Sequence, residues 1–247
     1  MTTALDHVGK AKLTLSWRVR KQVMFLYEID SDAIAAHVPP SLEAMEVRPG
    51  VSLIAIECLH YYSDHFREGY REFLEMVLTV AVQPDLSIDM PVPRFCMHAI
   101  SVISDSPEFV EQEGHLLYTP TELVPGLRME FSEDGGGVDI YDGTTPMVMC
   151  RNTHPNPPYD HKVLWGQYYT NTNGLQQGIW RWEGQMFEHM KAGDWGSFHP
   201  HPVFKGIDLS RIRGCYRQMM AKPETVTDVR FYHLGLVSDR AGSRRGE

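Results

Sequence analysis

Three apolar, β-prone runs in the first half of the chain constrain its fold most. Residues 51–61, 70–83 and 94–104 are rich in Val, Ile, Leu and Tyr, and such runs favour extended backbone. They are too short to cross a bilayer as helices: the apolar stretch at residues 76–82 has seven residues, whereas a membrane helix needs about 20. We therefore predict a strand in each of the three segments.

Turn dipeptides divide the middle of the chain into further strands. Asp134-Gly135 and Asp142-Gly143 are strong hairpin signals. They separate β-prone segments, so the middle third is predicted to be an antiparallel meander. The predicted strands are residues 127–132, 137–141 and 147–152, followed by 163–170 and 225–237.

Capping residues and helical spacing predict four helices. Ser106 and Pro107 are an N-cap and a first helical residue, and Gly114 ends that helix. Apolar residues recur at helical spacing in two later segments. The predicted helices are residues 31–37, 106–114, 179–191 and 208–221, and the prolines of residues 153–162 predict a loop.

Many strands, few helices and frequent turns indicate an α+β fold. We predict a curved antiparallel sheet or a β-barrel-like core with a few peripheral helices. The sequence shows no internal repeat and no linker that would divide it. Residues 1–237 are therefore predicted to form a single domain, and residues 238–247 a disordered tail.

Composition narrows the class of partner. Of the 247 residues, 43% are hydrophobic and 22% charged, and the net charge is −9. This balance is typical of a soluble globular protein, and a cytoplasmic one is the simplest interpretation. The negative charge disfavours nucleic acid and anionic membranes as partners. The four widely spaced cysteines are predicted to be buried free thiols: Cys58, Cys96, Cys150 and Cys215.

An ordered series of motifs resembles the acetoacetate decarboxylase superfamily. One motif reads Tyr-Glu-Ile-Asp-Ser-Asp-Ala-Ile, the next Val-Pro-Pro-Ser-Leu-Glu, and a third Gly-Tyr-Arg-Glu-Phe. The series occupies residues 27–34, 38–43, 69–73, 96–114 and 226–229, with Pro120 in the expected place. The resemblance covers about residues 18–152 and the last strand, whereas residues 153–222 lie outside it.

The resemblance also exposes a missing nucleophile. In the superfamily, Pro-Lys-Lys follows the helix, and the first lysine forms a Schiff base with a keto acid. Here Pro120 is followed by Thr121 and Glu122. Schiff-base chemistry at this position is therefore excluded, because it needs an amine. Lys162 and Lys205, in Pro- and His-rich segments, are the alternative amines.

The resemblance implies a set of site residues. Arg20 takes the place of an arginine that binds the substrate carboxylate, and Glu72 that of a pocket glutamate. His115 and Glu122 supply further acid–base groups. The alternative interpretation is that Arg20 and Glu72 are solvated charges and His115 is structural. The predicted catalytic residues are Glu122, Glu72 and His115, and the predicted substrate-binding residues are Arg20, Tyr70, Tyr118 and Thr121.

The second half of the chain leaves alternatives open. Twelve histidines form no diagnostic metal-binding spacing, so neither a metal nor another cofactor is predicted. Aromatic residues are dense in residues 153–205, which fits either core or a wall around an aromatic or cyclic substrate.

The sequence thus predicts a small-molecule enzyme of lyase, hydratase or isomerase type. Its substrate would be a keto or enol compound, processed by carboxylate and histidine acid–base chemistry. Two alternatives remain: a hydrolase, cofactor-free or metal-assisted, and a non-catalytic small-molecule-binding protein. A homo-oligomer is expected, because the sheet edges need covering.

Overall fold

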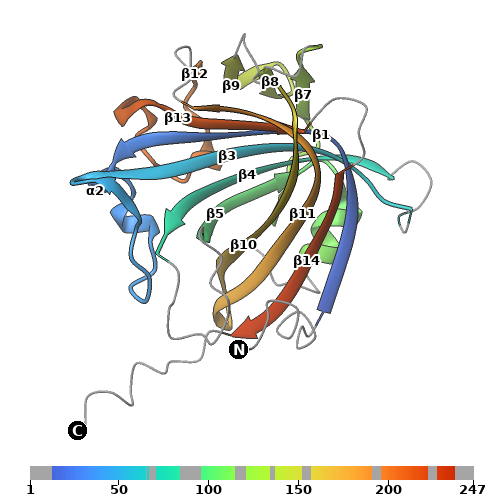
Figure 1. Cartoon of the computed structure of the whole chain (residues 1–247), viewed down its shortest axis with the longest axis horizontal. Helices are drawn as coiled ribbons and strands as arrows, with labels where there is room; N and C mark the ends of the chain where they lie inside the picture. Colours follow the sequence, from blue (N-terminus) through green and yellow to red (C-terminus); the bar gives the residue numbers. More distant parts are fainter. Residues whose placement is uncertain are drawn as a thin grey trace, which may run out of the picture.

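Long strands curve around a common axis and close into a ring (Figure 1). The computed structural model describes residues 13–64, 66, 71–83, 96–114, 121–133, 137–151, 157–190, 196–221 and 227–236. Within these residues the main sheet has ten strands. In spatial order the ring runs through β1 (Leu13–Asp30), β3 (Val51–Tyr62), β4 (Glu72–Val82), β5 (Cys96–Ser104), β10 (Tyr159–Asn171) and β11 (Gly174–Met190).

Two strands share the position that closes the ring between β11 and β1. The β14 strand (Thr227–Leu236) pairs with the first part of each, and β13 (Ile212–Ala221) with the last part of each. Ring neighbours are antiparallel except for β5 and β10, which are parallel. Two short strands extend the sheet, β2 (Glu46–Arg48) and β6 (Thr121–Leu123). The predicted α+β fold with a barrel-like core is confirmed.

Side chains alternate between the two faces of the ring, as the strand period of two requires. In β4, Phe73, Val77 and Ala81 face the interior, where they join one buried cluster. Met76 and Leu78 point outward into a second cluster. The ring therefore has a packed interior and a packed outer layer.

A second, four-stranded sheet covers part of the outer layer (top of Figure 1). Its Val138, Ile140 and Cys150 are fully buried in the outer cluster. Gly196 precedes its last strand at φ +86°, and an added Cβ would overlap the backbone of Met149, so only glycine fits there. The strands are β7 (Leu127–Phe131), β8 (Gly137–Asp142), β9 (Thr145–Arg151) and β12 (Ser197–Phe198).

Two predicted helices are confirmed. The first consists of α2 (Ser31–Ile34) and a 3₁₀ turn, Ala35–His37. The second is α3 (Pro107–Gln112), where the Ser106 side chain accepts a hydrogen bond from the backbone N–H of Phe109.

The other two predicted helices are wrong. Residues 179–191 lie largely in β11, and residues 208–221 form a 3₁₀ turn (Leu209–Arg211) followed by β13. Trp182 and Met186 are spaced for a helix, but an interval of four also places two residues on one face of a strand. Pairing with distant strands then decides the structure over local spacing.

Several smaller predictions have clear outcomes. All eight predicted strands are present within a few residues of their expected ends. The four cysteines are buried and free. The predicted loop at residues 153–162 is wrong at its end, because β10 begins at Tyr159, and residues 153–156 lie outside the described residues. The first turn dipeptide and the C-terminal tail lie outside the described residues. No helix in the described ranges is long and apolar enough to cross a membrane.

Candidate functional site inside the ring

A small cavity lies inside the ring and is lined by carboxyl groups and aromatic rings. Its volume is about 20 Å³, which is room for about one water molecule. We call it the interior cavity. It is lined by Glu57, Leu59, Tyr61, Glu75, Val77, Val102, Glu113, Gln167, Trp180, Trp182 and Phe231.

Strand alternation places two of the carboxyl groups there. Glu75 lies between Phe73 and Val77 on the inward face of β4. Glu57 occupies an inward position of β3, two residues before Leu59. In each strand the glutamate interrupts an apolar run, which is costly unless the carboxyl stays protonated or finds a partner.

Burial dominates the electrostatics of Glu57. It raises the pKa of Glu57 to about 7, although a hydrogen bond from Gln22 acts in the opposite direction. Gln22 Nε2 donates to Glu57 Oε1 at 2.6 Å, and Gln22 is only 2% exposed. Glu57 therefore changes charge near neutral pH, as a proton-transfer group must.

Glu75 is held in its protonated form more strongly. Burial raises its pKa well above the usual range, and the charges of Glu113 and Glu57 raise it further. The Tyr61 hydroxyl shares a hydrogen bond with Glu75, and burial also raises the pKa of Tyr61. Glu113, which follows α3, is 5% exposed and completes the group of three carboxyls.

Aromatic side chains form the opposite wall. The rings of Trp180 and Phe231 lie 4.7 Å apart, and Trp180 Nε1 donates to Gln167 Oε1. Trp182 is 1% exposed, and its Nε1 has no hydrogen-bond partner in the described part of the chain. A buried indole N–H without an acceptor costs free energy. A ligand with an acceptor atom would recover that cost by accepting a hydrogen bond from Trp182.

The predicted pair Arg20 and Glu72 lies together, but on the outer face of the ring. Arg20 Nη2 is 2.9 Å from Glu72 Oε1, and both side chains are 48% exposed. His60 Nε2 is 3.2 Å from the other oxygen of Glu72. Neither Arg20 nor Glu72 lines the interior cavity.

A bulge in β1 explains why Arg20 lies outside. Trp17 and Val19 face the interior, but pairing with β3 shifts register between Val19 and Lys21. The inward face then continues with Gln22 and Met24. The extra residue reverses the alternation, so the interior receives an amide rather than a guanidinium.

The outer ion pair is expected to contribute little stability. Glu72→Gln should change the free energy of unfolding by less than about 1 kcal/mol, because half-exposed pairs are screened by water. Urea denaturation of the two proteins measures this difference. A loss of several kcal/mol would show that Glu72 has a structural role that its exposure does not indicate.

The segment after α3 is only partly described. Thr121 pairs in register with Val102, which lines the interior cavity, so Thr121 lies on the same face, beside that cavity. Glu122 is 54% exposed and forms an ion pair with Lys205, one of the alternative amines. The predicted residues Tyr70, His115 and Tyr118 lie outside the described residues, as does the side chain of Lys162.

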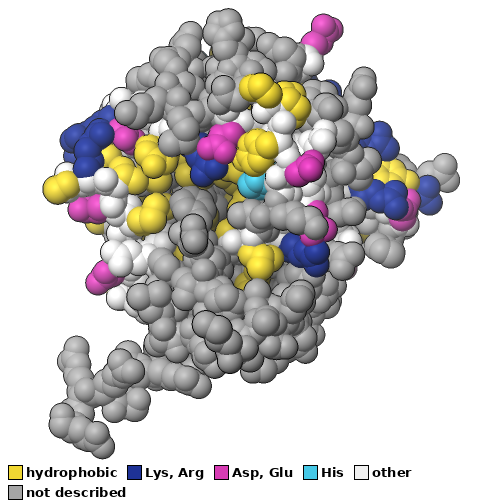
Figure 2. Space-filling view, viewed as in Figure 1, with side chains coloured by type: hydrophobic (Ala, Val, Ile, Leu, Met, Phe, Trp, Pro, Cys, Tyr) yellow, Lys and Arg dark blue, Asp and Glu magenta, His cyan; other side chains and the backbone are white. Residues whose placement is uncertain are grey.

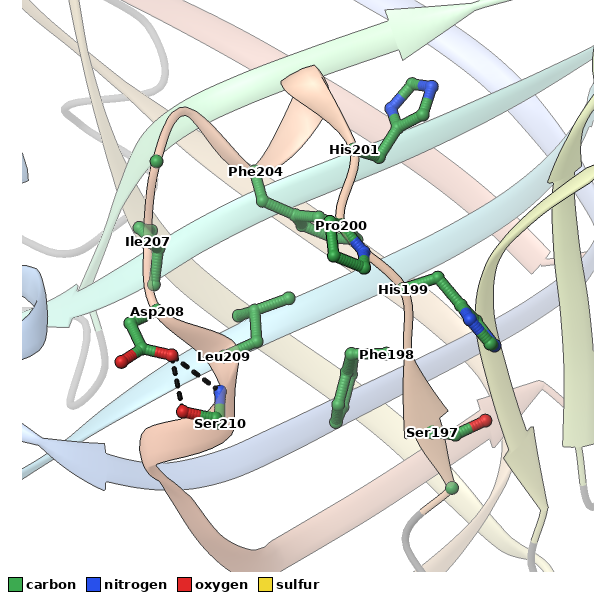
Figure 3. Close-up of a pocket in the computed structure, with 12 residues that line it drawn as sticks. Ser197, Phe198, His199, Pro200, His201, Phe204, Ile207, Asp208, Leu209 and Ser210 are labelled. Carbon is green, nitrogen blue, oxygen red and sulfur yellow. Dashed lines mark hydrogen bonds between the residues drawn. The ribbon is translucent and has the colours of Figure 1, made fainter.

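A larger groove of about 480 Å³ is formed by residues 196–210. Figure 3 shows Phe198 and Leu209 at this groove, and His199 and His201 also line it. The Asp208 carboxylate accepts hydrogen bonds from the Ser210 backbone and hydroxyl. The groove thus combines apolar surface with two histidines and a carboxylate that is held by Ser210.

On the face shown in Figure 2, the described residues show no concentration of one charge. On the face in Figure 2, acidic and basic side chains are interspersed with hydrophobic ones. The described residues contain no group of three or more His, Cys, Asp or Glu side chains that could hold a metal ion. The interior cavity is therefore the candidate functional site, because it brings three carboxyl groups together.

Comparison with solved structures identifies the architecture. A structure of acetoacetate decarboxylase superposes with a TM-score of 0.59 at 12% identity, covering 92% of this chain and 91% of that one. The chain has the acetoacetate decarboxylase fold. The enduracididine biosynthesis enzyme MppR, complexed with pyruvate, superposes with a TM-score of 0.56 at 12% identity, covering 90% and 88%. An acetoacetate decarboxylase-like enzyme from Sphingomonas wittichii RW1 gives 0.53 at 10% identity, covering 91% and 92%.

These likenesses are structural only. No family model matches the chain, and no curated protein matches it in sequence. At 10–12% identity the comparisons establish the fold and leave the chemistry to this chain's own residues.

The three carboxyls of the interior cavity are not among the site residues predicted from the sequence. A signal was present for Glu75, the one charged residue in the apolar run from Phe73 to Val82. The same holds for Glu57 within β3. Period-two alternation would have separated the inward Glu75 from the outward Glu72. Glu113 offered no comparable signal, because its position depends on how α3 packs.

Proposed function

We propose that this protein is an enzyme that moves protons beside the carbonyl group of a small keto or enol substrate. The reaction would be of lyase, hydratase or isomerase type and would occur in the interior cavity. One observation carries the proposal: three carboxyl groups share an enclosed apolar site. Such sites tune carboxyl groups for general acid–base catalysis.

Glu57 and Glu75 supply complementary protonation states. With a pKa of about 7, Glu57 is partly ionised at neutral pH and acts as the base. Its carboxylate takes a proton from the carbon next to the carbonyl, and the C–H electron pair forms the C=C bond of an enol. The carbonyl oxygen takes the proton of Glu75, which burial keeps protonated. Reprotonation at carbon, or loss of a leaving group, completes the reaction.

A lysine Schiff base is not part of this mechanism. No lysine lines the interior cavity in the described part of the chain. Lys205 is engaged by Glu122 outside that cavity. Among the described residues, the ionisable side chains that line the cavity are thus the three carboxyl groups and Tyr61.

The fold supports a carbonyl substrate. The structures with this fold include a decarboxylase of acetoacetate and MppR with pyruvate. Thr121 beside the cavity would extend the binding site. The present cavity holds about one water, so a substrate enters by displacing side chains that now fill the interior.

Exchange of carbon-bound protons tests the proposal without knowledge of the substrate. The native protein should catalyse deuterium uptake next to the carbonyl of one or more small ketones in D₂O, followed by proton NMR. Acetone, 2-butanone and cyclohexanone form a suitable panel. Sodium cyanoborohydride, which near neutral pH reduces imines but not simple ketones, should leave the rate unchanged when it is added with the active ketone, because no imine forms.

Two outcomes would contradict the proposal. Absence of exchange for every ketone would favour the non-catalytic alternative. Inactivation by cyanoborohydride, with a lysine adduct found by mass spectrometry, would restore a Schiff-base mechanism.

A further inference from the structure

A buried amide approaches Glu57 from the neighbouring strand. In the pairing of β1 with β3, Gln22 lies opposite Leu59 and Met24 lies opposite Glu57. Gln22 and Glu57 are therefore diagonal neighbours on the inward face of the ring. Gln22 Nε2 donates to Glu57 Oε1 at 2.6 Å. Because Gln22 is only 2% exposed, this hydrogen bond is formed away from water, where it is stronger.

The bulge in β1 supplies this amide. Continued alternation from Val19 would bring Lys21 inward instead of Gln22, but the register shifts between Val19 and Lys21. Lys21 Nζ lies instead 5.7 Å from the ring centre of Phe131, on the outer face. Bulges often lie next to active sites, where they redirect a side chain. Here the bulge places a neutral donor beside Glu57.

A neutral donor suits a carboxyl group that changes charge during a reaction. A cation in the same place would favour the carboxylate strongly, whereas the Gln22 amide offsets burial only in part and the pKa of Glu57 stays at about 7. The amide also carries an acceptor, so after rotation its oxygen accepts a hydrogen bond from the protonated carboxyl group. Gln22 thus suits both protonation states of Glu57.

The hydrogen bond makes the two oxygens of Glu57 different. Oε1 shares its electron density with the Gln22 amide, so Oε2 is the more basic oxygen. The bond also fixes the plane of a carboxyl group at the end of a side chain that otherwise has several rotamers. A base must lie within reach of one particular C–H bond, and a fixed plane meets that requirement.

We infer that Gln22 is a positioning residue of the interior cavity, which holds Glu57 by Oε1 and leaves Oε2 as the atom that takes the proton from the substrate. Gln22 takes no proton itself and acts through Glu57. This inference rests on the proposed function for the role of Glu57 as the base, and it adds the residue that controls that base.

Titration of the Glu57 carboxyl group tests the hydrogen bond without a substrate. Its carbon-13 resonance should titrate at about pH 7 in the native protein. Gln22→Met keeps a side chain of similar length and removes the donor. Its Glu57 midpoint should rise by about one pH unit or more, because a hydrogen bond to a charged group is lost. Gln185→Met is the matched control: it removes an exposed glutamine that donates to Asp160, so the Glu57 midpoint should not move.

Other titratable groups face the same cavity and are common to all proteins compared. Among the described residues they are Tyr61 on β3, Glu75 on β4 and Glu113 after α3. A difference in the Glu57 midpoint between the native protein and Gln22→Met therefore reports the lost amide.

A measurement on the native protein decides even where Gln22→Met fails to fold. The side-chain nitrogen-15 resonance of Gln22 should shift with the same midpoint as the Glu57 carbon, because its N–H donates to that carboxylate. An unmoved Gln22 resonance would overturn the inference. So would a Glu57 midpoint that is unchanged or lower in Gln22→Met.

The exchange rate on the active ketone separates positioning from charge. At about pH 9 Glu57 is mostly ionised in both the native protein and Gln22→Met, and the rate without protein is subtracted. The kcat of Gln22→Met should still be at least about tenfold below the native value, with KM little changed, because the carboxylate is no longer oriented. Gln185→Met should keep the native kcat. Recovery of the native kcat by Gln22→Met at this pH would show that Gln22 does not position Glu57.

The inference and the proposed function fail in different ways. Ketone exchange by the native protein, with an unmoved Glu57 midpoint in Gln22→Met, overturns the inference and leaves the proposed function in place. A raised midpoint in a protein that exchanges no ketone upholds the effect of Gln22 on Glu57 and overturns the proposed chemistry.

Discussion

Replacing Glu75 by glutamine is expected to slow proton exchange on the active ketone by at least about 100-fold, which is the usual contribution of a positioned general acid. The amide keeps the shape of the side chain and can still accept from Tyr61, but it has no acidic proton to give. Because the lost interaction belongs to the transition state, the fall should appear in kcat rather than in KM. Rates measured by NMR over a range of ketone concentrations separate the two constants.

Three further variants serve as controls for Glu75→Gln. Glu130→Gln should retain the native rate, and Glu75→Asp should recover part of it because the acidic proton is restored. If Glu72→Gln lost exchange while Glu75→Gln kept it, the chemistry would belong to the outer pair of Arg20 and Glu72. The interior assignment would then be wrong.

Strand positions were predictable because their signals are local. Apolar, β-prone runs define β3 and β4, and the turn at Asp142-Gly143 separates β8 from β9, without reference to the rest of the chain. The β11 segment was not predictable in this way. Its Trp182 and Met186 fit a helix as well as a strand. The segment pairs on one side with β10, which directly precedes it, and on the other with the distant strands β14 and β13.

The site was less predictable than the fold, and the reason is geometric. A single-residue bulge after Val19 decides that Gln22 faces inward and Arg20 outward. The residue types at that point do not predict a bulge. The family resemblance aligned Arg20 with a substrate-binding arginine, but alignment by motif order does not carry side-chain direction through a change of register.

Glu57 has a second expected effect, on stability, that does not depend on any substrate. Its pKa rises from 4.5 to about 7 on folding because of burial. Below pH 4.5 both folded and unfolded states hold the proton, and Glu57 costs nothing. Between pH 4.5 and 7 only the folded state keeps it, so the free energy of unfolding falls as pH rises. Above pH 7 the free energy of unfolding has fallen by its full amount, about 3 kcal/mol.

Glu57→Gln should therefore leave stability nearly unchanged at pH 4.5 and raise it by about 3 kcal/mol at pH 8. Urea denaturation of both proteins at several pH values measures the difference. The comparison is needed because burial lowers the pKa of His98 to about 4, which makes stability fall as pH drops from 6.5. His98 is present in both proteins, so its effect cancels. A difference independent of pH would show that Glu57 titrates normally, and the base of the proposed mechanism would then lack its tuned pKa.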